Sequence, residues 1–334
     1  MSVLMSNLCS ELYLSSIRFV ERWIFRMEDH EAAEYFEELL RKADGEPTST
    51  GLAAIETLLR CIRQSSANTT NELHDELQKV VKAILNTDHS SASVQSASQL
   101  FLRFISLATA EQNVQEFSKL MDYYKDRGQR FVERVAKSRS FVSRFARPFI
   151  QSNMRILTHS CSRCVLRALV DAKKDGVSVE VFVTEAQPGL SGRRMHRSLE
   201  EAGISSTVIL DSAVGYVMES IDAVFVGAEG VMETGGIINK IGTLNLAICA
   251  KAFNKPLYVM AECIKFIREY PLNQSDIPLE FKYSSSTLHA NPCDLSKQHP
   301  RADYTPPQYI NLLFTDLGIL TPAAVADELI KLYT

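Results

Sequence analysis

The segment that decides the fold is GAEGVMETGGIINKIGT, residues 227–243, which follows the apolar run IDAVFV at residues 221–226. The apolar run predicts a buried strand, and the glycines after it lead through turns to the predicted start of a helix. We expect Asn239 and Lys240 at that start, where backbone N–H groups, an amide and a positive charge suit an anion. The segment therefore predicts a phosphate site beyond the end of a strand.

The chain around this segment, residues 151–334, alternates short apolar runs with helical segments. The two helices predicted between the early strands, CVLRALVDAKKDG and SGRRMHRSLEEAG, each close on a glycine of the C-cap kind. Alternating strands and helices are typical of βαβ units, and apolar strands suit a sheet that is covered on both faces. We therefore predict a doubly wound, Rossmann-like α/β domain with a parallel sheet, and its predicted strands are RILTHS, VSVEVFVTE, STVILD, IDAVFVGAE, KPLYVMAE and INLLFTD.

Residues 27–150 have a helical period throughout. Apolar residues recur at three- and four-residue spacing, and turn-rich breaks separate the periodic stretches: ADGEPTSTG, SSANTT and NTDHSSAS. The segment SQLFLRFISLA and a long helix that ends near Pro148 follow these breaks. This half is predicted to be an all-helical domain.

The long helix before Pro148 is basic, with eight Lys or Arg between Lys125 and Arg147 against Asp126 and Glu133. A nucleic-acid patch is one interpretation of these charges. An apolar stripe runs alongside them, at Phe131, Val135, Val142, Phe145 and Phe149. The stripe favours a packed helix whose solvated face carries arginines for protein partners or for an anionic ligand.

Residues 1–26 form an N-terminal extension of uncertain role. They are amphipathic and carry arginines, as a mitochondrial presequence does, but Glu11 and Glu21 argue against that interpretation. The alternative is an extra helix or an upstream start, because a new acidic helix begins at Met27. We favour the alternative.

Composition excludes several classes of function. A net charge of −4 over 334 residues argues against a nucleic-acid binder, and the lack of a long apolar run argues against a membrane protein. The seven cysteines are typical of reduced thiols in a cytosolic protein. Cys161 and Cys164 form a CxxC pair, but no second pair is spaced for a metal, and redox or metal chemistry is the minor alternative. The GxGxxG and Walker A motifs are absent, which argues against a dinucleotide domain or a P-loop. We expect no metal and no cofactor.

The ends of the predicted strands carry polar residues that a parallel sheet brings to one edge. Arg163 supplies a second cation for a phosphate, and Glu229 suits a general acid or base if the pocket raises its pKa. Cys161 beside His159 suits a nucleophile. Each residue also has a structural interpretation, in which Lys240 is a solvated cap, His159 a hydrogen-bonded core histidine and Glu229 a turn cap. We favour a cleft for a small phosphorylated ligand, a sugar phosphate or a nucleotide monophosphate, lined by Thr158, His159, Ser160, Ser162, Arg163, Gln187, Glu229, Asn239 and Lys240.

Long motifs in both halves resemble a known family. The chain is similar, from about Met27 to its C-terminus, to the family of initiation factor 2B alpha, beta and delta subunits and related sugar-phosphate isomerases, and within it to the alpha subunits. The motifs that carry the resemblance are LFLRFISLA, THSCSR, VTEAQPGLSGR, LDSAVGYVM, VGAEGVMETGGIINKIGT, KPLYVMAECIKFIREYPLNQSDIP and LLFTDLGILTPAAVADELIKLY.

The resemblance implies a regulatory, non-catalytic subunit of the cytosol. Such subunits form a homodimer through the α/β domain and join beta, gamma, delta and epsilon subunits in the guanine nucleotide exchange factor for initiation factor 2. The epsilon subunit carries the exchange activity. The alpha subunit helps to sense phosphorylated initiation factor 2 alpha, which lowers exchange under stress, and we expect this contact near Glu37 to Ala54.

The isomerases of the family suggest the alternative function, an active aldose–ketose isomerase of sugar phosphates. Those enzymes have a cysteine directly after Thr-His of the first strand and an aspartate in a Gly-Ala-Asp motif, where this chain has Ser160 and Glu229. Cys161 comes one residue late, so in a regular strand its side chain faces the other way. We therefore predict a cleft that keeps the binding residues Asn239 and Lys240, and that has no catalytic residues.

Overall fold

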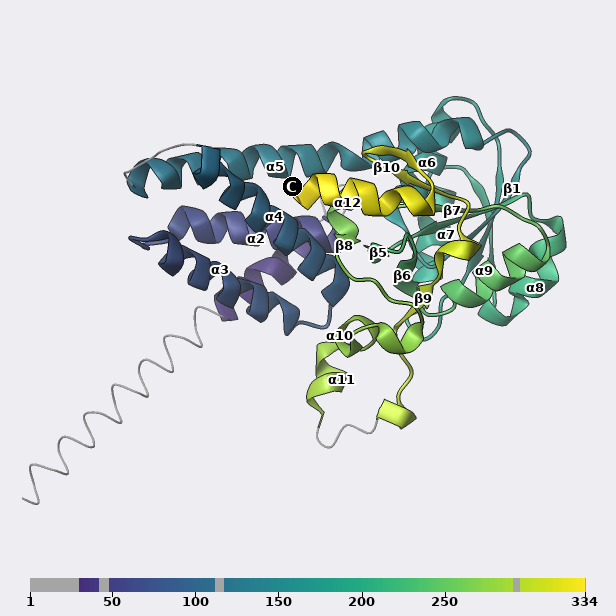
Figure 1. Cartoon of the computed structure of the whole chain (residues 1–334). Coiled ribbons are helices and arrows are strands. Elements are labelled where there is room, and N and C mark those ends of the chain that lie inside the picture. The colour runs from purple at the N-terminus through teal and green to yellow at the C-terminus, as the bar shows by residue number, and fades with distance from the viewer. Residues whose placement is uncertain (1–29, 42–47, 112–116, 291–294, 334) are drawn as a thin grey trace, which may run out of the picture.

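The computed structural model describes residues 30–41, 48–111, 117–290 and 295–333. A layer of helices and a sheet covered by helices lie side by side, and the long helix α5 runs from the first into the second (Figure 1). The predictions for residues 1–26, and for part of the surface at 37–54, lie outside the described residues. In the described part of the chain, no helix is long and apolar enough to cross a membrane.

The helical half begins with a helix at residues 30–41. Ser49 and Thr69 cap the next two helices, because their side-chain oxygens accept hydrogen bonds from backbone N–H groups of the first turn. Apolar faces of the four helices that follow residue 48 share one core, and Phe36 of the first helix packs in a second cluster with Ala53 and Ile84. The predicted all-helical arrangement is observed, as α2 Thr50–Gln64, α3 Thr70–Leu85, α4 Ser91–Glu111 and α5 Phe117–Ala146.

One predicted break in the helical half is too long. NTDHSSAS, residues 86–93, was expected as a turn, but α4 already begins at Ser91. The hydroxyl oxygen of Ser90 accepts a hydrogen bond from the N–H of Ser93, and its carbonyl oxygen accepts one from the N–H of Val94. These are the hydrogen bonds of a serine N-cap. The serines of this stretch therefore extend α4 toward the sheet.

The predicted parallel sheet is present and has the strand order β11-β10-β7-β4-β1-β2-β3. All pairings are parallel except that of β10 with β11, a C-terminal hairpin that the sequence did not predict. The strands are β1 Arg155–His159, β2 Glu180–Thr184, β3 Ser205–Ile209, β4 Ala223–Gly227, β7 Leu257–Met260, β10 Leu312–Thr315 and β11 Gly318–Leu320.

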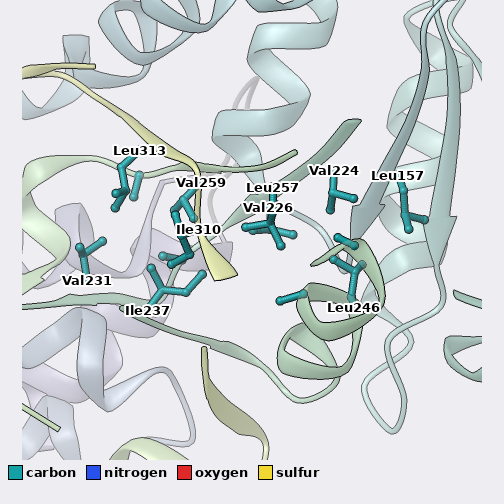
Figure 2. Close-up of a cluster of buried hydrophobic side chains, with 14 of the residues drawn as sticks. Leu157, Val224, Val226, Val231, Ile237, Leu246, Leu257, Val259, Ile310 and Leu313 are labelled. Atoms are coloured by element: carbon teal, nitrogen blue, oxygen red, sulfur yellow. The ribbon is translucent and has the colours of Figure 1, made fainter. Parts of the chain in front are cut away.

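Helices cover both faces of this sheet, which makes the half doubly wound, as predicted. Successive residues of β4 show it, because Val224 packs in one core and Phe225 in the other. Figure 2 shows the first core, in which Leu246 of α9 meets strand residues such as Leu157. The first core is covered by α8 Val214–Val217, α9 Thr243–Ala252 and α12 Val325–Tyr333, and the second by α5, α6 Arg163–Lys174 and α7 Ser191–Glu201.

A second, four-stranded sheet of order β8-β5-β6-β9 corrects the interpretation of residues 227–243. The segment after β4 forms an antiparallel hairpin rather than a loop that opens a helix, and Asn239 and Lys240 are the last residues of a strand. Gly235 makes the turn, because its φ of 80° and the backbone of Pro322 against it leave no room for a side chain. The strands are β5 Gly230–Met232, β6 Ile237–Lys240, β8 Phe266–Ile267 and β9 Ala302–Thr305, and the short helices α10 Leu279–Lys282 and α11 Ser285–His289 precede β9.

Candidate ligand-binding cleft

A cleft of about 620 Å³ lies between the two halves, at the carboxyl ends of β1, β2 and β4. Eight of the nine predicted site residues line it: His159, Ser160, Ser162, Arg163, Gln187, Glu229, Asn239 and Lys240. Thr158 does not, because it lies within β1, one residue before the strand ends, and is fully buried in the sheet. The structure therefore brings eight of the nine residues together at the edge of the sheet, and Thr158 is the exception.

Glu229 and Lys240 form an ion pair in the cleft, with 2.6 Å between Oε1 and Nζ. Oε2 of Glu229 accepts a hydrogen bond of 2.8 Å from the hydroxyl of Ser90. Burial raises the pKa of Glu229, but the charge of Lys240 and the hydrogen bonds from Lys240 and Ser90 outweigh it and bring the pKa below its ordinary value. Glu229 is thus a carboxylate at neutral pH, and the raised pKa that a general acid needs is not observed.

His159 has the geometry of a hydrogen-bonded core histidine. Its Nε2 lies 2.9 Å from the carbonyl oxygen of Ile241, so Nε2–H donates there, and its Nδ1 lies 2.6 Å from Oγ1 of Thr184 and accepts from that hydroxyl. Burial lowers the pKa of His159, which keeps the ring neutral. Both ring nitrogens are occupied by the protein itself, so neither is available as a base for Cys161.

The expectation for Cys161 assumed a regular strand, which the chain does not keep at this point. β1 ends at His159, and Ser160 has a left-handed backbone with φ of 64°, so strand alternation stops before Cys161. Ser160 and Cys161 therefore both line the cleft, and the hydroxyl of Ser160 lies 2.7 Å from that of Ser191 on α7. Burial raises the pKa of the Cys164 thiol well above its ordinary value, so the CxxC pair at the start of α6 lacks a reactive thiolate at Cys164.

Positive charge gathers where α6 begins. Ser162 caps the helix by accepting the N–H of Val165, and Arg163 donates to the carbonyl oxygen of Thr48 in the helical half. Burial lowers the pKa of Arg163, and the like charges of Arg139 and Arg194 lower it further. Arg194, on α7, has no hydrogen bond or ion pair among the described residues. An anion placed here would relieve this repulsion.

The start of α9 is not free for a phosphate, contrary to expectation. Oδ2 of Asp303, on β9, accepts the backbone N–H groups of Gly242 at 2.8 Å and Leu244 at 3.2 Å. Asn239 donates its amide to the hydroxyl of Thr243 within the same turn. Burial raises the pKa of Asp303 to about 7, although the N–H donors act in the opposite direction. A carboxylate of the chain thus takes the place that the sequence assigned to a ligand.

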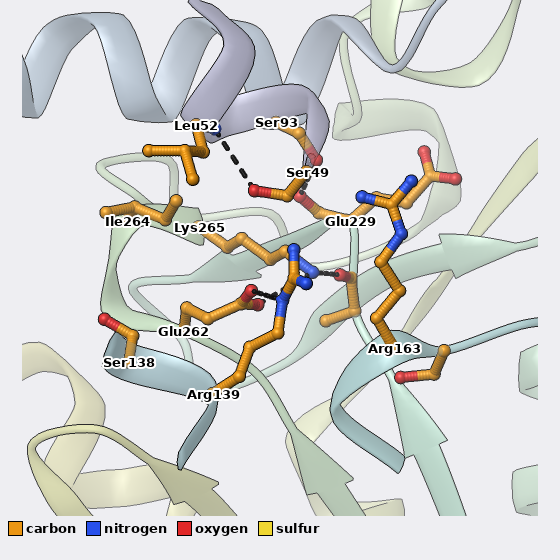
Figure 3. A network of polar contacts seen from close by, with 12 residues as sticks. Ser49, Leu52, Ser93, Ser138, Arg139, Arg163, Glu229, Glu262, Ile264 and Lys265 are labelled. Carbon is orange, nitrogen blue, oxygen red and sulfur yellow. Dashed lines mark hydrogen bonds and ion pairs between the residues drawn. The ribbon is translucent and has the colours of Figure 1, made fainter. Parts of the chain in front are cut away.

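Three further residues of the cleft were missed by the sequence interpretation. Figure 3 shows Arg139 of α5 and Lys265 beside the Glu262 carboxylate, to which they pair at 3.2 and 3.1 Å. Burial raises the pKa of Glu262, but the two cations lower it far more, so it is ionised. Lys265 also donates to the carbonyl oxygen of Ala228, beside Glu229. Glu262 and Lys265 lie three residues apart, but Arg139 precedes Glu262 by 123 residues, so no local pattern connects the three.

The serines of α4 were missed as well, although their spacing is a signal. Ser93 donates its hydroxyl to the backbone oxygen of Glu229, and Ser96 shares its one hydroxyl hydrogen between those of Ile264 and Phe266. Ser90, Ser93 and Ser96 recur every three residues and so share one face of the helix. A polar seam on an otherwise apolar helix indicates contact with backbone groups of another element.

The cleft carries an excess of positive charge and no metal-like cluster. Six Lys or Arg line it against four Asp or Glu, and within the described ranges no group of His, Cys, Asp and Glu is placed to hold a metal ion. Gln187 lies at the exposed rim, where its backbone N–H binds Asp211. The arrangement suits an anionic ligand with hydroxyl groups.

The fold and the cleft define a class of proteins with a helical layer beside a Rossmann-like sheet. A profile described as the Initiation factor 2 subunit family matches residues 42–322. The chain is 51% identical over 294 residues to translation initiation factor eIF2B subunit alpha of Caenorhabditis elegans, covering 87% of this chain and 96% of that protein. It is 28% identical over 274 residues to ribose 1,5-bisphosphate isomerase of Archaeoglobus fulgidus, covering 80% and 83%.

Solved structures share the fold. A chain of the tetrameric eIF2B-beta2-delta2 complex from C. thermophilum superposes with a TM-score of 0.70 at 18% identity, over 92% of this chain and 95% of that chain. The chain belongs to the Initiation factor 2 subunit family.

Proposed function

We propose that the chain acts as a regulatory, non-catalytic alpha subunit of the guanine nucleotide exchange factor for initiation factor 2. The observation that carries this proposal is the 51% identity that extends over 96% of an eIF2B alpha subunit, against 28% to an isomerase. The cleft supports it, because the Ser160 hydroxyl is a weak acid that is bonded to Ser191 and Glu229 is an ion-paired carboxylate. Neither group is poised to move the protons of an isomerisation.

The partners we propose are a second copy of the chain, the beta, gamma, delta and epsilon subunits, and initiation factor 2 with its phosphorylated alpha subunit, all in the cytosol. Large apolar side chains are exposed around α8 and α9, at Leu210, Tyr216, Ile248 and Phe253, and Tyr216 is 90% exposed. Several exposed apolar side chains on and beside two helices that contact each other are typical of a protein–protein interface. They support dimerisation through the α/β half.

For the cleft we propose a sugar phosphate or a nucleotide monophosphate. Arg163 and Arg194 favour the phosphate. Titration calorimetry of the pure protein with ribose 5-phosphate and AMP tests this proposal. Binding below millimolar concentration supports it, and no heat with either compound contradicts it.

The proposed regulatory function is tested by affinity purification of the tagged full-length chain from lysate, with mass spectrometry of what accompanies it. We expect beta, gamma, delta and epsilon subunits in near-equal amounts. A second arm adds the chain to the purified remaining subunits and measures nucleotide release with and without phosphorylated initiation factor 2 alpha. A chain that is recovered alone, or that leaves the inhibition unchanged, contradicts the proposal.

The competing function is an aldose–ketose isomerase, and the observation in its favour is a cleft that retains Asn239 and Lys240. It predicts turnover of ribose 1,5-bisphosphate or ribose 1-phosphate that is lost on Glu229→Gln. Lack of turnover across aldose 1-phosphates and phosphates with a free anomeric hydroxyl excludes it.

A further inference from the structure

The loop between β4 and β5 connects the cleft to the first turn of α4. Glu229 contacts Lys240 with Oε1, Ser90 with Oε2 and Ser93 with its backbone oxygen, at 2.6, 2.8 and 2.8 Å. The two serines belong to the helical half, and Lys240 belongs to the cleft. One carboxylate thus bonds at the same time to a cleft cation and to the start of a helix in the other half.

We propose that the helical half senses an anion in the cleft through Glu229: an anion that pairs with Lys240 releases Glu229, and the first turn of α4 loosens. The inference rests on the proposed function of the cleft as a ligand site and adds how that site regulates the protein. A phosphate dianion attracts Lys240 more strongly than a carboxylate does at the same distance, and it repels Glu229.

Glu229 can respond to such an anion by moving away or by taking up a proton, and either response weakens its hydrogen bond with Ser90. If the carboxylate moves away, the bond breaks. If it takes up a proton instead, the bond loses the charge that strengthens it. Ser90 also receives the N–H of Ser93, so it is the residue that holds the first turn of α4.

The effect is confined to that turn because the next contacts of α4 do not depend on Lys240. Ser96 donates to Ile264 and Phe266 in the buried seam. Beyond it, Ala97, Leu100 and Phe101 pack in the core that α4 shares with α2 and α5. The start of α4 is therefore the part of the helical half that can respond without unfolding that core.

Coupling of this kind is reciprocal. A partner that binds the helical half and orders the start of α4 lowers the affinity of the cleft for an anion. A metabolite in the cleft likewise weakens such a partner. In the proposed complex, this coupling would make the binding of a partner to the helical half depend on the concentration of the metabolite.

Hydrogen exchange of the intact chain, followed by mass spectrometry, tests the inference without a ligand. Lys240→Met removes the cation, and we expect exchange at residues 91–95 to rise about fivefold, as for the loss of one hydrogen bond. Arg194→Met is the matched control, because it removes a cation of the same cleft that has no bond to the helical half among the described residues. It should leave exchange at residues 91–95 unchanged.

Ser90→Ala and its combination with Lys240→Met complete a double-mutant cycle. Ser90→Ala alone should raise exchange in the same peptide, and Lys240→Met added to it should raise exchange no further. Independent, additive effects of the two substitutions, or no effect of Lys240→Met, would overturn the inference. If Ser90→Ala does not fold, as judged by circular dichroism, Glu229→Gln takes its place with the same expectation.

The ligand arm uses ribose 5-phosphate at a concentration that calorimetry shows to saturate the protein. We expect faster exchange at residues 91–95 and unchanged exchange around Ser96 to Phe101. Slower exchange at residues 91–95 overturns the inference while the ligand proposal stands. If calorimetry shows no binding, the ligand proposal fails, and the variants still decide whether Lys240 acts on α4.

Discussion

The Nζ atom of Lys240 lies 2.6 Å from Oε1 of Glu229, so a carboxylate of the chain itself neutralises the lysine that the sequence offers to a phosphate. The Lys240 side chain is 42% exposed and that of Glu229 only 16%. A ligand therefore reaches the cation from the cleft while the carboxylate stays behind it. This arrangement makes Glu229 a determinant of affinity.

We expect Glu229→Gln to increase the affinity for ribose 5-phosphate by about fivefold to tenfold, because it removes a negative charge next to the proposed anion site. Titration calorimetry measures the change. Glu280→Gln is the control, since Glu280 lines the same cleft without an ion pair to Lys240 among the described residues. A loss of affinity in Glu229→Gln would contradict the proposed role of Glu229.

The stability of the protein should depend on pH through Asp303. Its pKa is raised to about 7, so between its unfolded value and pH 7 the folded state holds the proton more tightly. Stability from this group is therefore greatest at low pH and is lost as pH rises through 7, by about 1 kcal/mol between pH 6 and pH 8.

Urea unfolding of the wild type and of Asp303→Asn at pH 6 and pH 8 checks this expectation. Asparagine cannot ionise, so the difference in stability between the two proteins should change by about 1 kcal/mol between these pH values, with the variant gaining at pH 8. The comparison cancels the contribution of His159, which is present in both proteins. A pH-independent difference would show that Asp303 has an ordinary pKa.

Arg139→Met should destabilise the protein by about 2 to 3 kcal/mol, because it leaves Glu262 buried with Lys265 as its remaining cation. The side chains of Arg139 and Glu262 are 12% and 4% exposed. Asp126→Asn, which breaks the solvent-exposed pair with Arg130, is the control and should cost about 0.5 kcal/mol or less. Equal midpoints of urea unfolding for the two variants would refute this ranking.

Gly192→Ala should destabilise the protein by about 2 kcal/mol or more, because a β-carbon at Gly192 would lie 1.9 Å from the carbonyl oxygen of Thr184. The start of α7 must then move away from the end of β2, and Ser191 moves with it. Gly189→Ala, where no atom beyond the adjoining residues lies within 4 Å of the added carbon, is the matched control. Thermal unfolding compares them, and equal melting temperatures would contradict the predicted clash.

The strands of the main sheet were predictable because their signal is local. Ile156 and Val181 lie in short apolar runs bounded by turn residues, and the same runs appear in the structure as β1 and β2. The second sheet was not predictable in this way. β8 has two residues and β5 three, which is too short for a period, and they form only because Val231 and Phe266 pair across the chain.

The cleft was located correctly for a similar reason, since the carboxyl ends of parallel strands meet at one edge. The hydrogen bonds and ion pairs within the cleft were not predicted. Asp303, which occupies the start of α9, is separated from Gly242 by 61 residues, and no pattern in the sequence connects them. The interpretation of Asn239 and Lys240 as part of a helix start failed because these residues pair in a strand with Asp303 and Ala302 of β9, far along the chain.

The sequence alone determined the helical half, the parallel strands of the main sheet and the edge of that sheet where polar residues gather, because these follow from the local spacing of apolar residues. Only the tertiary structure decided what those polar residues do. Ser90 and Glu229 are 139 residues apart and bond directly. The pKa of Asp303, the occupied start of α9 and the contact of Ser90 with Glu229 all have the same origin. They depend on groups that folding brings together from distant segments.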